Sequence, residues 1–190
     1  MLPAKHWAHS FSISAEDIDY ITNLLLEKET PLSSTELAIA IVRQRLEEKR
    51  AEIKAQYEGT TVYRPANSYA IGDRLLFSTM DYATATITDI RDGLPTDDNG
   101  FKVASVQFDK ARYNLPNRQR EFAIEYTTEH PLNDEDVELH PANLDENYTP
   151  EQIINDPNTT IMQQVDKALT KNKDLVRISG TWFVRDLMMR

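Results

Sequence analysis

The stretch from Val62 to Tyr126 constrains the fold of this chain most strongly, because it holds four β-type runs separated by turn residues. The four runs cover residues 73–78, 84–91, 101–108 and 121–126. Asp92-Gly93 ends the second run and Asn99-Gly100 precedes the third, and both dipeptides are typical of turns. Short consecutive strands of this kind predict a small antiparallel sheet.

The apolar alternation changes phase inside two of these runs. In the second run Ala85 and Ile87 are followed by Ile90, and the third run breaks in the same way between Val103 and Val106. Because side chains of a strand alternate with a period of two, a change of parity predicts a bulge or a sharp bend. Bent strands favour a sheet that closes on itself.

The entry Ile71-Gly72-Asp73, followed by an apolar strand, a β-branched strand and a turn, resembles SH3-like and Tudor-like barrels. It is also similar to the barrel by which some bacterial transcription factors hold RNA polymerase. The resemblance implies a closed, antiparallel SH3-like β-barrel over residues 59–127. We therefore expect an α+β protein with this barrel at its centre.

Two capping signatures predict a pair of helices before the barrel. Ser14, with Asp17 as its partner three residues on, predicts a helix to Glu27. Ser33 begins the second signature, Ser-Ser-Thr-Glu, and predicts a long helix that ends near Gln56. The order helix, short proline-containing turn, helix resembles the front of a helix-turn-helix or winged-helix module.

The C-terminal part predicts two helices and a hairpin. Thr149-Pro150-Glu151-Gln152 combines a cap, a proline at the first helical position and a capping-box glutamine. Ile161, Val165 and Leu169 predict a second helix, and apolar runs flank the turn Ser179-Gly180. Helix, helix, hairpin resembles the back half of a winged helix, in which the hairpin is the wing.

Acidic residues are concentrated in one part of the chain. The net charge is −10, and residues 121–160 contain eleven Asp or Glu and no Lys or Arg. This strip includes an imperfect repeat that begins at His130-Pro131 and again at His140-Pro141. The expected segments are a helical region (1–58), the barrel (59–127), an acidic connector (128–148) and a winged-helix-like module (149–190). The sequence leaves open whether both helical parts form one composite domain with the barrel inserted.

The sequence contains none of the common catalytic or cofactor motifs. Its five glycines are isolated, so there is no phosphate loop, dinucleotide fingerprint or nucleophile elbow, and cysteine is absent. The pairs His6/His9 and His130/His140 are of a type that can bind a metal ion, but a structural role or a solvated acidic loop explains them more simply. We expect no enzymatic activity, no cofactor and no metal.

Basic side chains suggest where nucleic acid would bind. Those on the long helix, such as Arg43 and Arg45, alternate with glutamates and are explained by pairing within the helix. The C-terminal helix and wing provide the candidate nucleic-acid-binding residues Lys167, Lys171, Lys173, Arg177, Trp182 and Arg185. Trp182 also suits a core-filling role under the hairpin.

These patterns predict a non-enzymatic binding module, DNA- or transcription-associated, with double-stranded DNA as its partner. The alternative is a protein-interaction scaffold that uses the barrel and the acidic strip, or self-associates through the apolar C-terminal residues 187–189. No apolar run approaches the roughly 20 residues of a membrane helix, so no membrane association is expected. The absence of cysteine favours a cytoplasmic location.

Overall fold

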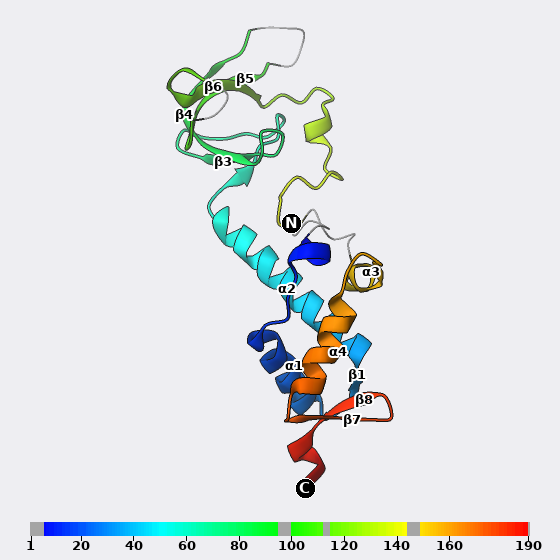
Figure 1. Ribbon diagram of the computed structural model, residues 1–190. Coiled ribbons are helices and arrows are strands. Elements are labelled where there is room, and N and C mark those ends of the chain that lie inside the picture. Colours follow the sequence, from blue (N-terminus) through cyan, green and yellow to red (C-terminus); the bar gives the residue numbers. More distant parts are fainter. Residues whose placement is uncertain (1–5, 95–99, 112–114, 144–148, 190) are drawn as a thin grey trace. The chain divides into compact units, whose positions relative to one another are not determined.

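The chain forms two compact units in the computed structural model, which describes residues 6–94, 100–111, 115–143 and 149–189. One unit comprises residues 1–51 with 145–190, and the other comprises residues 52–144 (Figure 1). About 41% of the chain is helical and 23% is strand, in two separate sheets, so the expected α+β class is confirmed. Within the described residues, no helix is long and apolar enough to cross a membrane.

The first unit combines helices with a small antiparallel sheet. The helices are α1 (Ala15–Lys28), α2 (Ser34–Gln56, which runs on into the second unit), α3 (Pro150–Asn155) and α4 (Ile161–Lys171), with short turns η1 (His6–Ser10) and η4 (Arg185–Met189). The strands are β1 (Leu32–Ser33), β7 (Leu175–Ile178) and β8 (Thr181–Val184). They pair in the order β1-β8-β7, so β8 joins the N-terminal strand to the C-terminal hairpin.

Local side chains fix the starts of three helices, as the sequence predicts. Ser14 and Asp17 form a reciprocal capping box at α1, and Thr149 and Gln152 form another at α3. At α2 the Ser33 amide donates to Glu36 Oε2 (2.8 Å), and the Glu36 amide donates to Ser33 Oγ (3.2 Å). Each box satisfies amides of a first turn that have no partner inside the helix.

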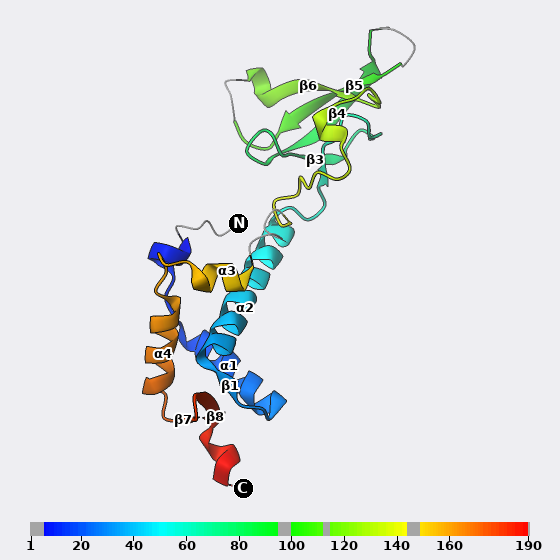
Figure 2. The ribbon, with the colours of Figure 1, turned by 90° about the vertical axis from the view of Figure 1, so that its right-hand side faces the viewer.

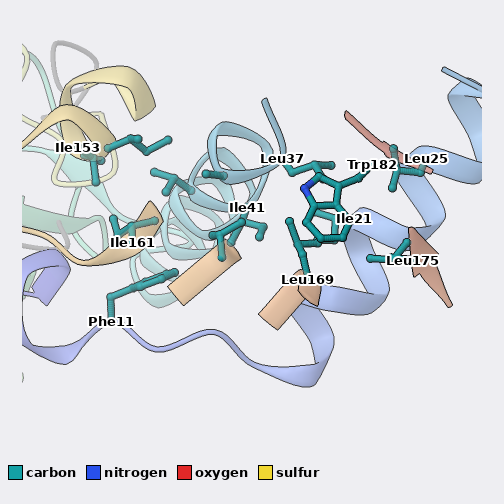
Figure 3. Packing of buried hydrophobic residues seen from close by; sticks show 14 of the residues in the cluster. Phe11, Ile21, Leu25, Leu37, Ile41, Ile153, Ile161, Leu169, Leu175 and Trp182 are labelled. Carbon is teal, nitrogen blue, oxygen red and sulfur yellow. The ribbon is translucent and has the colours of Figure 1, made fainter. Parts of the chain in front are cut away.

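One apolar core joins the two distant parts of the chain in the first unit (Figure 3). Figure 3 shows Trp182 of β8 beside Leu37 of α2, Ile21 of α1 and Leu169 of α4. Ile21, Leu37 and Leu169 are fully buried, and Trp182 is 4% exposed. The N- and C-terminal helical parts therefore share one core, which is the composite arrangement that the sequence left open.

The second unit is built on a five-stranded sheet in the order β2-β3-β4-β5-β6 (Figure 2). The strands are β2 (Thr61–Val62), β3 (Arg74–Phe77), β4 (Ala83–Asp92), β5 (Lys102–Phe108) and β6 (Gln119–Ile124), with short turns η2 (Pro116–Arg118) and η3 (Pro131–Asn133). One face of the sheet carries the core, in which the rings of Phe77 and Phe108 lie 5.5 Å apart. Strands β3 to β6 match the four predicted runs to within two residues, and β2 was not predicted.

One of the two predicted bends is confirmed. The pairing of β4 with β5 shifts register between Ile87 and Asp89, which is the bulge that the parity change predicted. The bend predicted in β5 is wrong: its pairing with β6 is continuous, and Ala104, Val106 and Phe108 alternate regularly toward the core. The earlier apolar residues of that run are only partly buried, so they create no change of parity.

The sheet is not a closed barrel, which corrects the expected SH3-like antiparallel barrel. In the described part of the chain, β2 and β6 form the two ends of the sheet, and β2 runs parallel to β3. Among the described residues, two backbone hydrogen bonds cross the opening, from the Glu125 amide to the Asn67 carbonyl (2.9 Å) and from the Tyr126 amide to the Pro65 carbonyl (2.8 Å). Strand β2 has two residues and is soon followed by Pro65, which lacks an N–H, so no longer ladder forms there.

An extended acidic segment follows β6, and we call residues 127–138 the acidic strap. Arg64 holds it by donating to the carbonyl oxygens of Leu132 (3.0 Å), Asp134 (2.7 Å) and Val137 (2.8 Å). Asn133 adds a hydrogen bond from its side-chain amide to the Tyr126 carbonyl (3.0 Å). The strap is therefore fixed through its backbone, which leaves its acidic side chains exposed.

Candidate nucleic-acid interface

Helix α4 separates an apolar face from a polar, basic one. Ile161, Val165 and Leu169 are fully buried in the core of the first unit. The exposed positions of the helix carry Gln163, Lys167, Thr170 and Lys171. Positions three and four apart lie on the same side of a helix, so these residues form one stripe with two cations and no acid.

Two partly buried polar residues of α4 attach it to other parts of the unit. Gln164 receives a hydrogen bond from the Ile13 amide (3.2 Å) and donates to the Phe11 carbonyl (3.0 Å). Asp166 Oδ1 accepts a hydrogen bond from Ser34 Oγ (2.6 Å). These contacts orient the helix, and the residues of its exposed stripe take no part in them.

Three residues from different elements form a hydrogen-bond relay beneath the stripe. Trp182 Nε1 donates to Ser34 Oγ (2.9 Å), and Ser34 Oγ in turn donates to Asp166 Oδ1 (2.6 Å). Ser34 is 6% exposed and Trp182 is 4% exposed, so water competes little for these polar groups. The relay links the hairpin, the start of α2 and the middle of α4.

The β7–β8 hairpin turns tightly at Ser179 and Gly180. Both residues have positive φ (49° and 86°), which suits a two-residue turn whose twist matches the strands. Arg177 on β7 faces Trp182 on β8, and its guanidinium lies 5.8 Å from the centre of the indole. The arginine is exposed while the indole is buried, so the Trp182 ring supports the Arg177 guanidinium.

The structure places the six predicted residues on a continuous stretch from α4 to the start of η4. Lys167, Lys171, Lys173, Arg177 and Arg185 are all exposed, whereas Trp182 belongs to the core. Among the residues that the structure describes, none of these five cations forms an ion pair. The Arg185 amide donates to the Asp174 carbonyl (2.8 Å), which ties the start of η4 to the beginning of the hairpin.

Sequence reasoning missed several residues of this region. Gln163 and Thr170 lie on the same stripe as the two lysines, and the helical period of the sequence could have identified them. Ser34 and Asp166 are 132 positions apart, and no local pattern relates them. Their relay with Trp182 depends on the shared core.

Two cations of α2, Arg43 and Arg45, have partners on other elements, contrary to the pairing within the helix that the sequence predicted for them. Arg43 lies 3.9 Å from the Glu151 carboxylate of α3, with both side chains more than half exposed. Arg45 binds Asp17 of α1 through Nε (2.8 Å). These two arginines therefore contribute to contacts between helices.

The repeat around His130 and His140 is a repeated turn. His130 Nδ1 accepts a hydrogen bond from the Leu132 amide, and His140 Nδ1 accepts one from the Ala142 amide, both at 3.1 Å. In each copy the amide three residues on also donates to the histidine carbonyl. In the described part of the chain, no three His, Asp or Glu side chains lie close enough to hold a metal ion.

Comparison of the chain with protein-family models, with curated proteins and with solved structures gave no match.

Proposed function

We propose that this protein binds duplex DNA through the exposed stripe of α4 and the β7–β8 hairpin. In this proposal the first unit is a winged-helix domain, with the second unit inserted between its second and third helices. The order helix, strand, helix, then two helices and a hairpin, with the sheet β1-β8-β7, supports this assignment. Helix α4 is then the helix that enters the major groove, and the hairpin is the wing.

The observation that carries the proposal is the set of five exposed cations between Lys167 and Arg185. Asp174 is the only acidic residue in this stretch, although the whole chain has a net charge of −10. None of the five cations has an ion-pair partner among the described residues. An unneutralised basic stretch on an acidic protein suits a polyanionic ligand, because local charge determines phosphate contacts.

Each part of the surface has its own role in this proposal. Lys167 and Lys171 neutralise phosphates, and Gln163, one turn before Lys167 on the same stripe, is of a type that hydrogen-bonds to base edges. Arg177 and Arg185 contact phosphates or the minor groove from the wing. Trp182 is a positioning residue, because its buried ring supports Arg177 from below.

A fluorescence-anisotropy titration of the protein with random-sequence duplex DNA, between about 50 and 200 mM salt, tests the proposal. The logarithm of affinity is expected to fall linearly with the logarithm of salt, by about 0.9 for each phosphate neutralised. The double variant Arg177→Ala, Arg185→Ala is expected to lower that slope by about 2. Lys28→Ala, which removes an exposed cation of α1, is the matched control and should change it little.

Two results would contradict the DNA proposal. One is the absence of binding even at the lowest salt concentration. The other is an equal loss of affinity in the double variant and in Lys28→Ala, since this would indicate attraction by overall charge alone.

A second candidate function, a scaffold that binds basic protein surfaces, is supported by the acidic strap. The strap carries Glu129, Asp134, Glu135, Asp136 and Glu138, all exposed and without a basic residue among them. Arg64 fixes the backbone of the strap through three hydrogen bonds, so little ordering is needed on binding. Rigid presentation of like charges favours a complementary cationic partner.

An oligolysine peptide is the probe for this second function. Neutralising Glu135, Asp136 and Glu138 to their amides is expected to weaken peptide binding more than neutralising three exposed acids of α1, Glu16, Asp19 and Glu27. Equal losses in the two triple variants would show that the strap has no special role. The DNA titration is independent of this result.

A further inference from the structure

A groove next to the hairpin has the size and lining of a ligand site. It has a volume of about 420 Å³ and lies between the C-terminal end of α1, with the turn after it, and the side of β8 with η4. Its lining is mostly apolar and aromatic: Leu25, Pro31, Trp182, Phe183, Val184, Leu187 and Met188, with Glu29 and Thr30 as the polar members. Sites for small molecules typically have this size and this mixture of a mostly apolar wall with few polar groups.

Glu29 gives the groove its charge. It is the only charged residue in the lining, and among the described residues its carboxylate has no hydrogen-bond or ion-pair partner. An exposed carboxylate beside an apolar wall attracts a group that offers both an apolar body and a positive charge. The groove therefore favours cations over anions of the same shape.

The backbone at Glu29 is in a conformation that glutamate rarely adopts. Glu29 is the C-terminal cap of α1, with φ 49°, and its amide donates to the Leu25 carbonyl (3.1 Å). Glycine is the usual residue in this left-handed position, because it lacks the Cβ atom that clashes with the backbone there. A strained residue that carries the single charge of a groove is the kind of feature found at ligand sites.

We propose that this groove binds a small amphiphilic cation, with an aromatic or aliphatic body against Phe183, Val184 and Met188 and an amine beside Glu29. Met188 is 51% exposed at the mouth of the groove, and a ligand would cover it. The inference concerns a different ligand from the DNA-binding proposal, although Trp182 lines the groove and also supports Arg177.

Three probes with one apolar body and different charges test the proposal: 4-phenylbutylamine, 4-phenylbutanol and 4-phenylbutyrate. Each is titrated into the ¹⁵N-labelled protein, and backbone amide shifts of Thr30, Phe183 and Val184 report on the groove. For a ligand of this size we expect a dissociation constant of about 1 mM for the amine. The alcohol is expected to bind about threefold more weakly than the amine, and the acid more weakly still.

Glu29→Gln is the decisive variant, because it keeps the shape of the side chain and removes its charge. It should make the amine and the alcohol bind equally while leaving the affinity for the alcohol unchanged. Glu27→Gln, which removes an exposed carboxylate of α1 outside the groove, should preserve the preference for the amine. Equal binding of all three probes to the unaltered protein, or shifts confined to other residues, would overturn the proposal, as would the absence of any saturable shift.

Discussion

Arg45 Nε lies 2.8 Å from Asp17 Oδ1, and this contact ties α2 to the first turn of α1. The same carboxylate accepts the Ser14 amide (2.8 Å) as part of the capping box, so one side chain serves both the cap and the packing of the two helices. Arg45 also donates to the Ser12 carbonyl (2.9 Å) and lies 5.2 Å from the centre of the Phe11 ring. Through these contacts, Asp17 and Arg45 fix the residues just before α1 as well as the start of the helix.

Breaking this pair should destabilise the first unit. Because Asp17 is 6% exposed, Arg45→Met is expected to lower the free energy of unfolding by about 3 kcal/mol, mostly by leaving a buried carboxylate without its cation. Trp7 and Trp182 both belong to this unit, so tryptophan fluorescence during urea unfolding measures the effect. Arg43→Met, which breaks the exposed pair with Glu151, is the control and should change stability by less than about 0.5 kcal/mol.

The Asp17 carboxyl should also make stability depend on pH. Burial alone would raise its pKa, but hydrogen bonds from Arg45 and Ser14 outweigh burial and hold the pKa below the ordinary value of 3.8. A carboxyl whose pKa is lower in the folded state stabilises the fold above its unfolded pKa and loses this effect as the pH falls through the folded pKa. The difference in free energy of unfolding between the unaltered protein and Asp17→Asn should therefore have its largest value above about pH 5 and decrease below pH 3.8. A difference that does not change with pH would contradict this prediction.

Ser34→Ala should loosen the hairpin while leaving α2 intact, because Ser33 and Glu36 form the capping box of that helix. The variant leaves the buried Trp182 N–H without its acceptor, at an expected cost of about 1–3 kcal/mol in unfolding free energy. If the DNA proposal holds, affinity for duplex DNA should fall at a protein concentration and temperature where the variant remains folded. Ser33→Ala is the contrast, since it should weaken the start of α2 without affecting the Trp182 indole proton signal in NMR spectra.

Arg64→Ala should release the acidic strap from the sheet. The variant removes three charged hydrogen bonds to backbone carbonyls, so amide hydrogen exchange within residues 129–138 should accelerate at least about tenfold. Arg64→Lys should restore this protection only in part, because an ammonium group lacks the planar fork of guanidinium. Arg91→Ala, which breaks an exposed pair with Glu121, should leave exchange in the strap unchanged, and equal acceleration in both variants would refute the role of Arg64.

Tyr63 should be among the last tyrosines to ionise. Burial, with a smaller effect of Tyr69, raises its pKa from 10.0 to about 12, and its hydroxyl donates to the Ala123 carbonyl (2.6 Å). The folded state holds this proton more tightly than the unfolded state. The Tyr63 hydroxyl therefore makes its whole contribution to the free energy of unfolding below about pH 10, and this contribution is lost as the pH rises toward 12. Absorbance at 295 nm during alkaline titration, compared between the unaltered protein and Tyr63→Phe, measures the step; a Tyr63 step near pH 10 would contradict the prediction.

The sequence by itself determined the local structure of this protein. The boxes at Ser14, Ser33 and Thr149, the turn at Ser179-Gly180 and the bulge after Ile87 all follow from residues within a few positions of one another. Such features depend on hydrogen bonds, steric limits and alternation that the local chain satisfies alone. They could therefore be predicted without any tertiary contact.

Only the tertiary structure decided how these elements combine. The shared core of Leu37, Leu169 and Trp182, the relay through Ser34 and Asp166, and the groove beside Glu29 all bring together residues from both ends of the chain. The sheet of the second unit stays open because β2 is short and parallel to β3, a choice of partner that hydrophobic alternation does not specify. Hydrophobic alternation indicates which side of an element is buried, and capping residues indicate where a helix begins. The partner against which that side is buried depends on packing between distant segments.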